Sequence, residues 1–341
     1  MTVDPPVGAS TATSGGLRGL DARVARLADA FTGRLSVTAL EVRTGMRVEL
    51  NADATVPTAS VIKVAVLCQA YEHLTESGLD PTVLIPIPDA HRVGGSGVLK
   101  SLMSPEALSF EDLATLMVTV SDNTATNVLM QWAGGPDAVT ERARTYGLER
   151  TVVHDYVTSA VARRGVEAFA ESTTRDLCAL GERLAGLTSV EPAWRRSALA
   201  TLAAQQYRDL VTRYWDLDTT ADLFEGQSRP SVEVCSKTGF FPGMRAELGV
   251  VQVNDEPRMI YAAVADKATD CGMAAEAEPA LACGLVGREL AAAWLSDVAG
   301  LRVLDTPYVA AWAAAPGDRP TRPEPPITLD ETRGAADRRD P

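Results

Sequence analysis

The sequence predicts an α+β fold in which helices cover a five-stranded antiparallel sheet and an all-helical subdomain is inserted within the chain. Alternating apolar and polar residues indicate two strands near the N-terminus and three near the C-terminus. The intervening region, about residues 58–225, has mostly helical spacing. Predicted helices precede the first strand and follow the last, an order that is typical of a sheet covered by helices.

Each element of this order has its own signal. Apolar residues from Leu17 to Phe31 recur at helical spacing, and residues 34–53 alternate as a hairpin with Thr44 and Gly45 at its turn. The runs "VEVCSKTG", "MRAELGVVQVN" and "RMIYAAVAD" predict the other three strands, and "PALACGLVGRELAAAWLSDVA" predicts the closing helix. We expect one catalytic domain over residues 17–313. The ends, 1–16 and 314–341, are expected to be disordered because they are small and polar or rich in proline and charge.

The composition narrows the possible partners and compartment. A chain of 341 residues with 46% hydrophobic content can bury a large core. Its net charge of −13 argues against nucleic acid and anionic membrane, which bind clustered Lys and Arg. The first residues contain no basic segment followed by an apolar run, so we expect a cytoplasmic protein. The five cysteines form no C-x-x-C pair and are expected to be reduced thiols.

The first candidate for chemistry is "ASVIK", in which Ser60 precedes Lys63 by three positions. The run around it is apolar on nearly every side, so the predicted helix is expected to be buried. Residues three apart share a helix face, and a desolvated lysine has a lowered pKa and can act as a base toward a serine. The alternative is a helix N-terminus with a capping serine and a lysine whose charge reaches solvent.

Two further polar stretches interrupt apolar runs. Ser121, Asp122 and Asn123 precede a helical segment and are either a helix N-cap or a proton-relaying hydroxyl beside a substrate-binding amide. Later, "SKTGFFPGMR" places Lys237, Thr238 and Gly239 at the end of a strand, which is either an ordinary strand end or a cation and a hydroxyl for an anionic substrate group.

These three motifs, in this order, resemble those of class A β-lactamases and penicillin-binding proteins. The resemblance extends from about residue 17 to 300 and implies the same fold. It implies that Ser60 is the nucleophile, Lys63 its base and Ser121 the proton relay near Lys237. It also implies that the substrate is held by the residues Ser96, Asn123, Thr238, Gly239, Phe240 and Arg245. The backbone N–H groups of Ser60 and Phe240 would form the oxyanion hole, and Arg245 would meet a carboxylate.

One part of the family pattern is missing. Class A β-lactamases carry a loop Glu-x-x-x-Asn whose glutamate activates the hydrolytic water. Aligning this chain on Gly147 puts Val157 and Val161 at those two positions. His154 or Asp155 could replace the glutamate through a different loop path, although an exposed or capping role is the simpler interpretation. Loss of a positioned base slows hydrolysis by about 10²–10⁴-fold.

The sequence therefore predicts a serine acyl-enzyme catalyst that transfers an acyl group from a small ester or amide to an amine, alcohol or water, with transfer favoured over β-lactam hydrolysis. The resemblance implies a role in specialised metabolism such as antibiotic biosynthesis. One alternative is a weak β-lactamase or D,D-peptidase-like hydrolase. The other is a non-catalytic protein that sequesters a ligand. His73, His91 and His154 lack metal-ligand spacing, and neither a metal nor a cofactor is expected.

Overall fold

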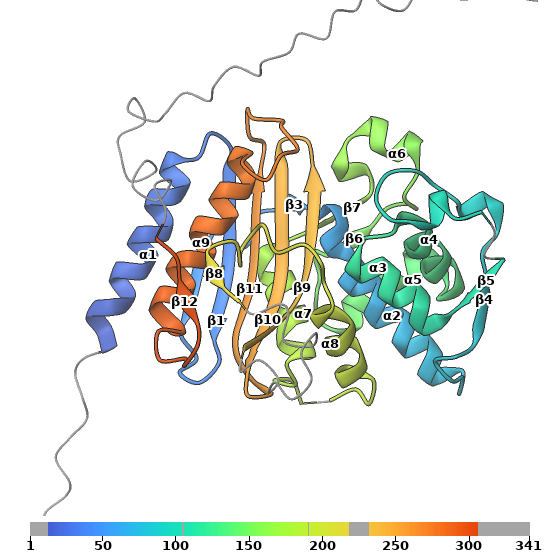
Figure 1. Cartoon of the computed structure of the whole chain (residues 1–341), viewed down its shortest axis with the longest axis horizontal. Helices are drawn as coiled ribbons and strands as arrows, with labels where there is room; N and C mark the ends of the chain where they lie inside the picture. Colours follow the sequence, from blue (N-terminus) through green and yellow to red (C-terminus); the bar gives the residue numbers. More distant parts are fainter. Residues whose placement is uncertain (1–12, 104–105, 190, 218–231, 306–341) are drawn as a thin grey trace, which may run out of the picture. The chain divides into compact units, whose positions relative to one another are not determined.

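The structure, a computed structural model, describes residues 13–103, 106–189, 191–217 and 232–305. Its main sheet has five antiparallel strands in the order β2-β1-β11-β10-β9. The bounds of these strands are β1 Arg34–Glu41, β2 Arg47–Leu50, β9 Val232–Phe241, β10 Met244–Val253 and β11 Glu256–Asp266. The predicted α+β fold and five-stranded antiparallel sheet are confirmed (Figure 1).

Helices pack on both faces of the sheet, as the sequence predicted. Helix α9, Glu278–Trp294, packs on β10 and β11, and α1, Thr13–Ala30, packs on α9. Helix α7, Thr174–Leu184, packs on β1, β10 and β11. Figure 1 shows α1 and α9 beside the strands on the side away from the remaining helices. The sheet is therefore buried on both faces, which agrees with strands that contain few exposed positions.

The inserted region is mostly helical and surrounds one buried helix. That helix, α2, Lys63–Glu76, follows the 3₁₀ turn η1, Ala59–Ile62, and contacts four other helices. Those four are α3 Phe110–Thr119, α4 Asn123–Trp132, α5 Gly135–Thr145 and α8 Arg195–Ala203. Ten of its fourteen residues are buried, which explains why its sequence is apolar on nearly every side.

Short elements complete the chain. They are β3 Val56–Pro57, β4 Leu84–Pro86, η2 Asp89–His91, η3 Leu99–Ser101, β5 Ala107–Ser109, β6 Val152–Val153, α6 Ser159–Arg164, η4 Val166–Ala168, β7 Ala170–Ser172, β8 Trp215–Asp216 and β12 Arg302–Val303. Two of them, α6 and η4, lie in the loop that follows β6.

Within the described residues, no helix has the length and apolar character needed to cross a membrane. None of the five cysteines, which all lie among the described residues, forms a disulfide.

One predicted boundary was wrong. Helix α1 begins at Thr13, inside the segment 1–16 that was expected to be disordered. The apolar spacing that starts at Leu17 indicates the packed face of the helix, whereas the first turn of a helix needs no apolar contact. The remaining expectations for the ends, residues 1–12 and 314–341, and the predicted end of the helical subdomain near residue 225 lie outside the described residues.

The contact between α9 and Val211 gives a test of the packing. A Cβ added at Gly287 would lie 1.8 Å from the carbonyl oxygen of Val211, so the helix or the facing backbone must move. We expect Gly287→Ala to lower the free energy of unfolding by about 1–3 kcal/mol or more, measured by urea denaturation. Gly19→Ala in α1 is the matched control, because its Cβ would meet only the end of the Arg23 side chain. Equal stability of the two variants would contradict this packing.

Candidate active site

The site begins where β3 leads into η1. Ala59 has a φ of +44°, a conformation that non-glycine residues rarely adopt, and it directly precedes Ser60. Ser60 is half-buried and lines a pocket, and Lys63 opens α2 three positions later. The 3₁₀ turn thus exposes the serine while it directs the lysine inward, so the two members of the Ser-x-x-Lys pair meet different environments.

Lys63 is completely buried and has three hydrogen-bond acceptors. Its Nζ donates to the carbonyl oxygen of Ser121 over 2.8 Å, to Ser121 Oγ over 3.1 Å and to Asn123 Oδ1 over 2.9 Å. Burial lowers the pKa of Lys63 well below its usual range, and the charge of Lys237 lowers it further, against the opposing effect of Asp122. A lysine with a lowered pKa can lose its proton near neutral pH and act as a base.

The turn between α3 and α4 presents the second motif. Ser121 has a φ of +55°, and its carbonyl and hydroxyl both face the Lys63 amine. Asp122 caps α4 by accepting from the N–H of Ala125, and it also accepts from the N–H groups of Val98 and Leu99. The motif is therefore both a helix N-cap and part of the site, so the two interpretations of the sequence are compatible.

The loop before η3 is fixed against this turn. Asn123 accepts from Lys63, donates through Nδ2 to the carbonyl of Gly94 over 3.1 Å, and donates its own N–H to the carbonyl of Ser96. Gly97 has a φ of +99°, and a Cβ there would lie 2.2 Å from a carboxylate oxygen of Asp122. The glycine-rich loop thus packs directly on the second motif and brings Ser96 to the rim of the pocket.

The third motif lies on β9, the last strand of the sheet, which contacts η1. A Cβ added at Gly239 would lie 2.8 Å from the carbonyl oxygen of Thr58 and 3.2 Å from the backbone nitrogen of Ser60. Side chains alternate along a strand, so Lys237 and Gly239 face the same side, toward the nucleophile. Glycine is required here because β9 passes so close to the turn that carries Ser60.

The register of β9 also fixes the backbone of Phe240. Phe241 pairs with Met244 across the two-residue turn Pro242–Gly243, and Phe240 pairs with Arg245. Hydrogen-bonded and non-hydrogen-bonded pairs alternate in an antiparallel ladder, and the pair that closes a two-residue turn is hydrogen-bonded. The N–H of Phe240 therefore points away from β10, off the edge of the sheet, where an oxyanion donor is needed.

Lys237 is the second buried amine of the site. Its Nζ donates to the carbonyl of Thr238 over 2.9 Å. Burial lowers the pKa of Lys237 to about 7, although the charge of Glu247 raises it in part. Thr238 is also buried, and its Oγ1 has no hydrogen-bond partner among the described residues. Because side chains alternate along β9, Thr238 faces the side opposite Lys237 and Gly239, and it does not line the pocket.

Arg245 does not occupy the position that we expected. Its side chain is buried, with Nη1 donating to the carbonyls of Phe241 and Met244 and Nη2 to that of Gly272. It does not line the pocket. Because both terminal nitrogens hold the end of the β9–β10 hairpin to the loop before α9, the expected contact with a substrate carboxylate is corrected to a structural role.

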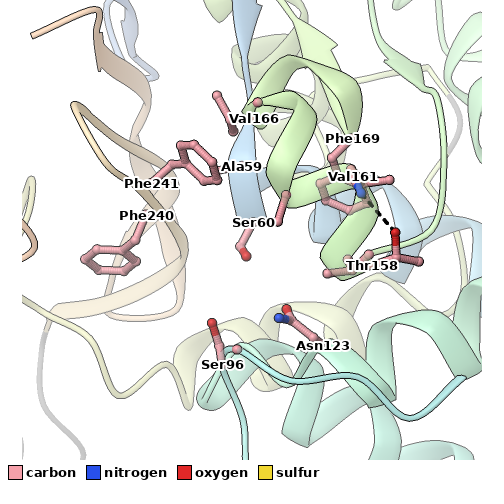
Figure 2. Close-up of a pocket in the computed structure, with 14 residues that line it drawn as sticks. Ala59, Ser60, Ser96, Asn123, Thr158, Val161, Val166, Phe169, Phe240 and Phe241 are labelled. Carbon is pink, nitrogen blue, oxygen red and sulfur yellow. Dashed lines mark hydrogen bonds between the residues drawn. The ribbon is translucent and has the colours of Figure 1, made fainter. Parts of the chain in front are cut away.

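The pocket beside Ser60 has a volume of about 230 Å³ and is mainly apolar. Figure 2 shows the Ser60 hydroxyl pointing into it, between Phe240 and Phe241 on one side and Thr158, Val161 and Phe169 on the other, with Ser96 and Asn123 beyond it. The full lining consists of Ala59, Ser60, Gly95, Ser96, Asn123, Val157, Thr158, Val161, Ala162, Gly165, Val166, Phe169, Phe240 and Phe241.

Val157 and Val161, the two positions that alignment on Gly147 matches to the glutamate and asparagine of class A β-lactamases, both line this pocket. The backbone of Val157 is fixed by Asn127, whose Nδ2 donates to its carbonyl over 2.8 Å and whose Oδ1 accepts from its N–H over 2.9 Å. No aspartate, glutamate or histidine is among the described residues that line the pocket. No lining side chain therefore offers a base to a water molecule. Glu167, which could compensate only by a shift of register, lies outside the lining, with Oε2 2.8 Å from the position of a Cβ at Gly165.

The two candidates for a substitute base lie elsewhere. His154 Nε2 is 3.1 Å from Glu171 Oε2, and Asp155 forms an ion pair with Arg164 over 3.1 Å. Neither lines the pocket, and all four side chains are at least one-third exposed. The simpler interpretation of these residues, as surface groups, agrees with this placement.

Sequence reasoning missed several residues of the site. Thr158, Val166 and Phe169 line the pocket although no motif contains them, and Phe241 lines it although only its neighbour Phe240 was expected to contact substrate. Asn127 was also missed, and an asparagine within the apolar helical run "TATNVLM" is a signal that could have found it, because buried amides need partners. The apolar residues carry no such signal, since valine and phenylalanine are ordinary core residues.

Curated relatives match parts of the chain. A β-lactamase of Streptomyces albus G is 30% identical over 139 residues, which is 39% of this chain and 44% of that protein. The β-lactamase AST-1 of Nocardia asteroides is 34% identical over 148 residues, 43% of this chain and 46% of that protein. The matched region thus spans less than half the length of these relatives.

Solved structures share the fold over most of the chain. A β-lactamase from Sphaerobacter thermophilus has a TM-score of 0.68 at 24% identity and covers 82% of this chain and 98% of its own. The protein PBP-A has a TM-score of 0.66 at 19% identity and covers 81% and 95%. A leucine-to-glutamate variant of PBP-A was solved as an acyl-enzyme complex with penicillin G.

The family model described as the β-lactamase enzyme family matches residues 19–294, which is most of the chain. The match includes the Ser60 turn, the Ser121 turn and the Lys237 strand. With this match, the shared fold and the three motifs around one pocket, the chain belongs to the β-lactamase enzyme family of serine hydrolases.

Proposed function

We propose that the protein transfers an acyl group from a small ester or amide to a non-water acceptor through an acyl-enzyme on Ser60. The observation that carries this proposal is the pair Val157 and Val161 in the pocket wall, where hydrolytic relatives need a base for water. An amine or alcohol is the expected acceptor. Such a transfer suits the biosynthesis of specialised metabolites, including antibiotics.

The arrangement of residues supports the acylation half of the reaction. Ser60 Oγ attacks the carbonyl carbon of the donor, and its proton passes to the neutral amine of Lys63. The oxyanion is held by the N–H groups of Ser60 and Phe240. Because Lys63 Nζ lies 3.1 Å from Ser121 Oγ, the proton continues through Ser121 to the leaving group. An ester on Ser60 remains.

The second half of the reaction depends on what can attack that ester. A water molecule needs a base to take its proton, and this contribution is typically about 10²–10⁴-fold. An amine is a stronger nucleophile than water and needs less assistance, and Lys63 and Ser121 can receive its proton on the polar side of the pocket. The acyl-enzyme is thus expected to persist until a suitable acceptor binds.

The first prediction concerns the nucleophile. With an activated ester, the protein is expected to gain the mass of one acyl group on Ser60, and added amine should remove it in proportion to amine concentration. Ser60→Ala should give neither adduct nor amide product in intact-mass spectrometry. Ser197→Ala, an exposed serine on α8, is the matched control. Rapid nitrocefin turnover without any ester-derived adduct would instead favour a β-lactamase, and full biological function of Ser60→Ala would favour a ligand-sequestering protein.

The second prediction concerns the missing base. Because Asn127 fixes the backbone of Val157, a glutamate at position 157 would be presented to the pocket. We expect Val157→Glu with Val161→Asn to hydrolyse the acyl-enzyme at least about tenfold faster, measured by single-turnover mass spectrometry. Val157→Gln with Val161→Asn is the matched control, since the amide cannot act as a base. Equal hydrolysis rates in the two double variants would show that a missing base does not limit hydrolysis of the acyl-enzyme.

The third prediction concerns pH. Acylation needs Lys63 neutral, so its rate should rise as pH increases through the lowered pKa of Lys63. The charged form of Lys237 supports the oxyanion and the leaving group, and its pKa of about 7 predicts a falling limb above neutral pH. Arginine stays protonated, so Lys237→Arg should move the falling limb to higher pH in stopped-flow acylation assays. A falling limb that stays in place in this variant would exclude Lys237 as its source.

A further inference from the structure

The pocket beside Ser60 has two unlike sides. Ser96 and Asn123 form a polar side, and we define the apolar wall as Val157, Val161, Val166, Phe169 and Phe241. In Figure 2 the labelled members of the apolar wall lie on the opposite side of Ser60 from Ser96 and Asn123. An acyl group on Ser60 can therefore place its chain and its reacting carbonyl in different surroundings.

The apolar wall itself contains no charged residue. Of the charges near it in the sequence, Arg163 and Glu167 are exposed and do not line the pocket, although a Cβ at Gly165 would lie 2.8 Å from Glu167 Oε2. Asp155 pairs with Arg164, and His154 contacts Glu171. The guanidinium of Arg245 donates to the backbone carbonyls of Phe241 and Gly272, and its Cζ lies 5.2 Å from the centre of the Phe240 ring. Among the described residues that line the pocket, no side chain carries a charge to offer a substrate carboxylate at this side.

The polar backbone groups of Val157 and the N–H of Val161, both in the apolar wall, are already paired. The N–H and carbonyl of Val157 bond to Asn127, and the N–H of Val161 donates to Thr158 Oγ1 over 3.1 Å. A buried polar group without a hydrogen bond is destabilised, so a substrate group placed here gains most if it is apolar. The surface that remains consists of methyl and aromatic groups.

The volume limits the size of this group. A cavity of about 150 Å³ lined by aliphatic and aromatic side chains is large enough to bind benzene. The pocket here, at about 230 Å³, has room for a phenyl ring or a medium-length alkyl chain beside the serine. A two-carbon acyl group would leave most of the apolar wall without contact.

We propose that the acyl donor of this enzyme carries an uncharged, apolar acyl chain that lies against the apolar wall. This rests on the proposed acyl-enzyme function and identifies the class of its substrate. Each methylene of the chain that is buried should increase acylation by up to about fourfold. A carboxylate at the end of the same chain would lose its hydration without gaining a partner.

The test compares the p-nitrophenyl esters of acetic acid, hexanoic acid and adipic acid. In the adipate ester only one carboxyl is esterified, so its acyl chain has the length of hexanoate but ends in a free carboxylate. In each reaction the bond between Ser60 Oγ and the acyl carbon forms, the bond to p-nitrophenolate breaks, and the serine proton leaves through Lys63. We expect the second-order rate of Ser60 acylation to be at least about tenfold higher for hexanoate than for either acetate or adipate. The adduct mass is measured in the same samples.

Two variants assign the preference to the apolar wall. Val166→Thr replaces a methyl by a hydroxyl of similar size at a half-buried position, and it should lower the hexanoate-to-acetate ratio. Val166→Phe should lower the same ratio by filling the pocket. Leu79→Thr, at an exposed apolar residue away from the pocket, is the control and should leave the ratio unchanged.

The outcomes separate this inference from the function on which it rests. If all three esters acylate Ser60 at similar rates, or adipate is fastest, the apolar donor is excluded while the acyl-enzyme function stands. An unchanged ratio in both Val166 variants would likewise exclude it. If no ester acylates Ser60, the proposed function is overturned, and the donor inference with it.

Discussion

The hydrogen bonds of the buried Lys63 amine connect every part of the site. An unpaired buried amine is strongly destabilised, so the fold must bring acceptors to it. They come from the Ser121 carbonyl and hydroxyl and from Asn123 Oδ1, all in the turn that opens α4. Asn123 and Asp122 then fix the glycine-rich loop through Gly94, Ser96 and Val98. The position of the glycine-rich loop that borders the pocket thus depends on Lys63, which lies in α2.

The edge strand provides the second constraint. The absence of a side chain at Gly239 lets β9 approach Thr58 and Ser60, and this approach brings Lys237 into the same buried region as Lys63. Two buried ammonium groups near each other disfavour double protonation. Burial lowers the pKa of both lysines, and the charge of Lys237 lowers that of Lys63 further. Close packing therefore places two amines with lowered pKa values near the turn that carries Ser60.

The sequence predicted the sheet, its flanking helices and the buried α2, because period-two and helical apolar patterns directly reflect which faces are packed. It also identified Asn123, which lines the pocket with Ser60, because polar residues within apolar runs are conspicuous, whereas Ser96 and Phe240 came from the family resemblance. It could not locate Phe169 or Phe241 in the pocket, since an apolar residue in a pocket and one in a core look the same in sequence. Arg245 was misplaced for a related reason: a charged residue on a strand does not show that its hydrogen bonds go to carbonyls.

In the proposed transfer reaction, the valines at 157 and 161 act in two ways at once. They offer no base, and they offer no side-chain hydrogen bond to keep a water molecule beside the acyl carbon. A bound water requires about two to four polar contacts. Asn127, which could have supplied some, is committed to the backbone of Val157. Polar partners for an incoming nucleophile remain near Ser96 and Asn123, on the side opposite the apolar wall. In the proposed reaction, the same residues that would slow hydrolysis would therefore favour an acceptor that brings its own polar groups and enters from that side.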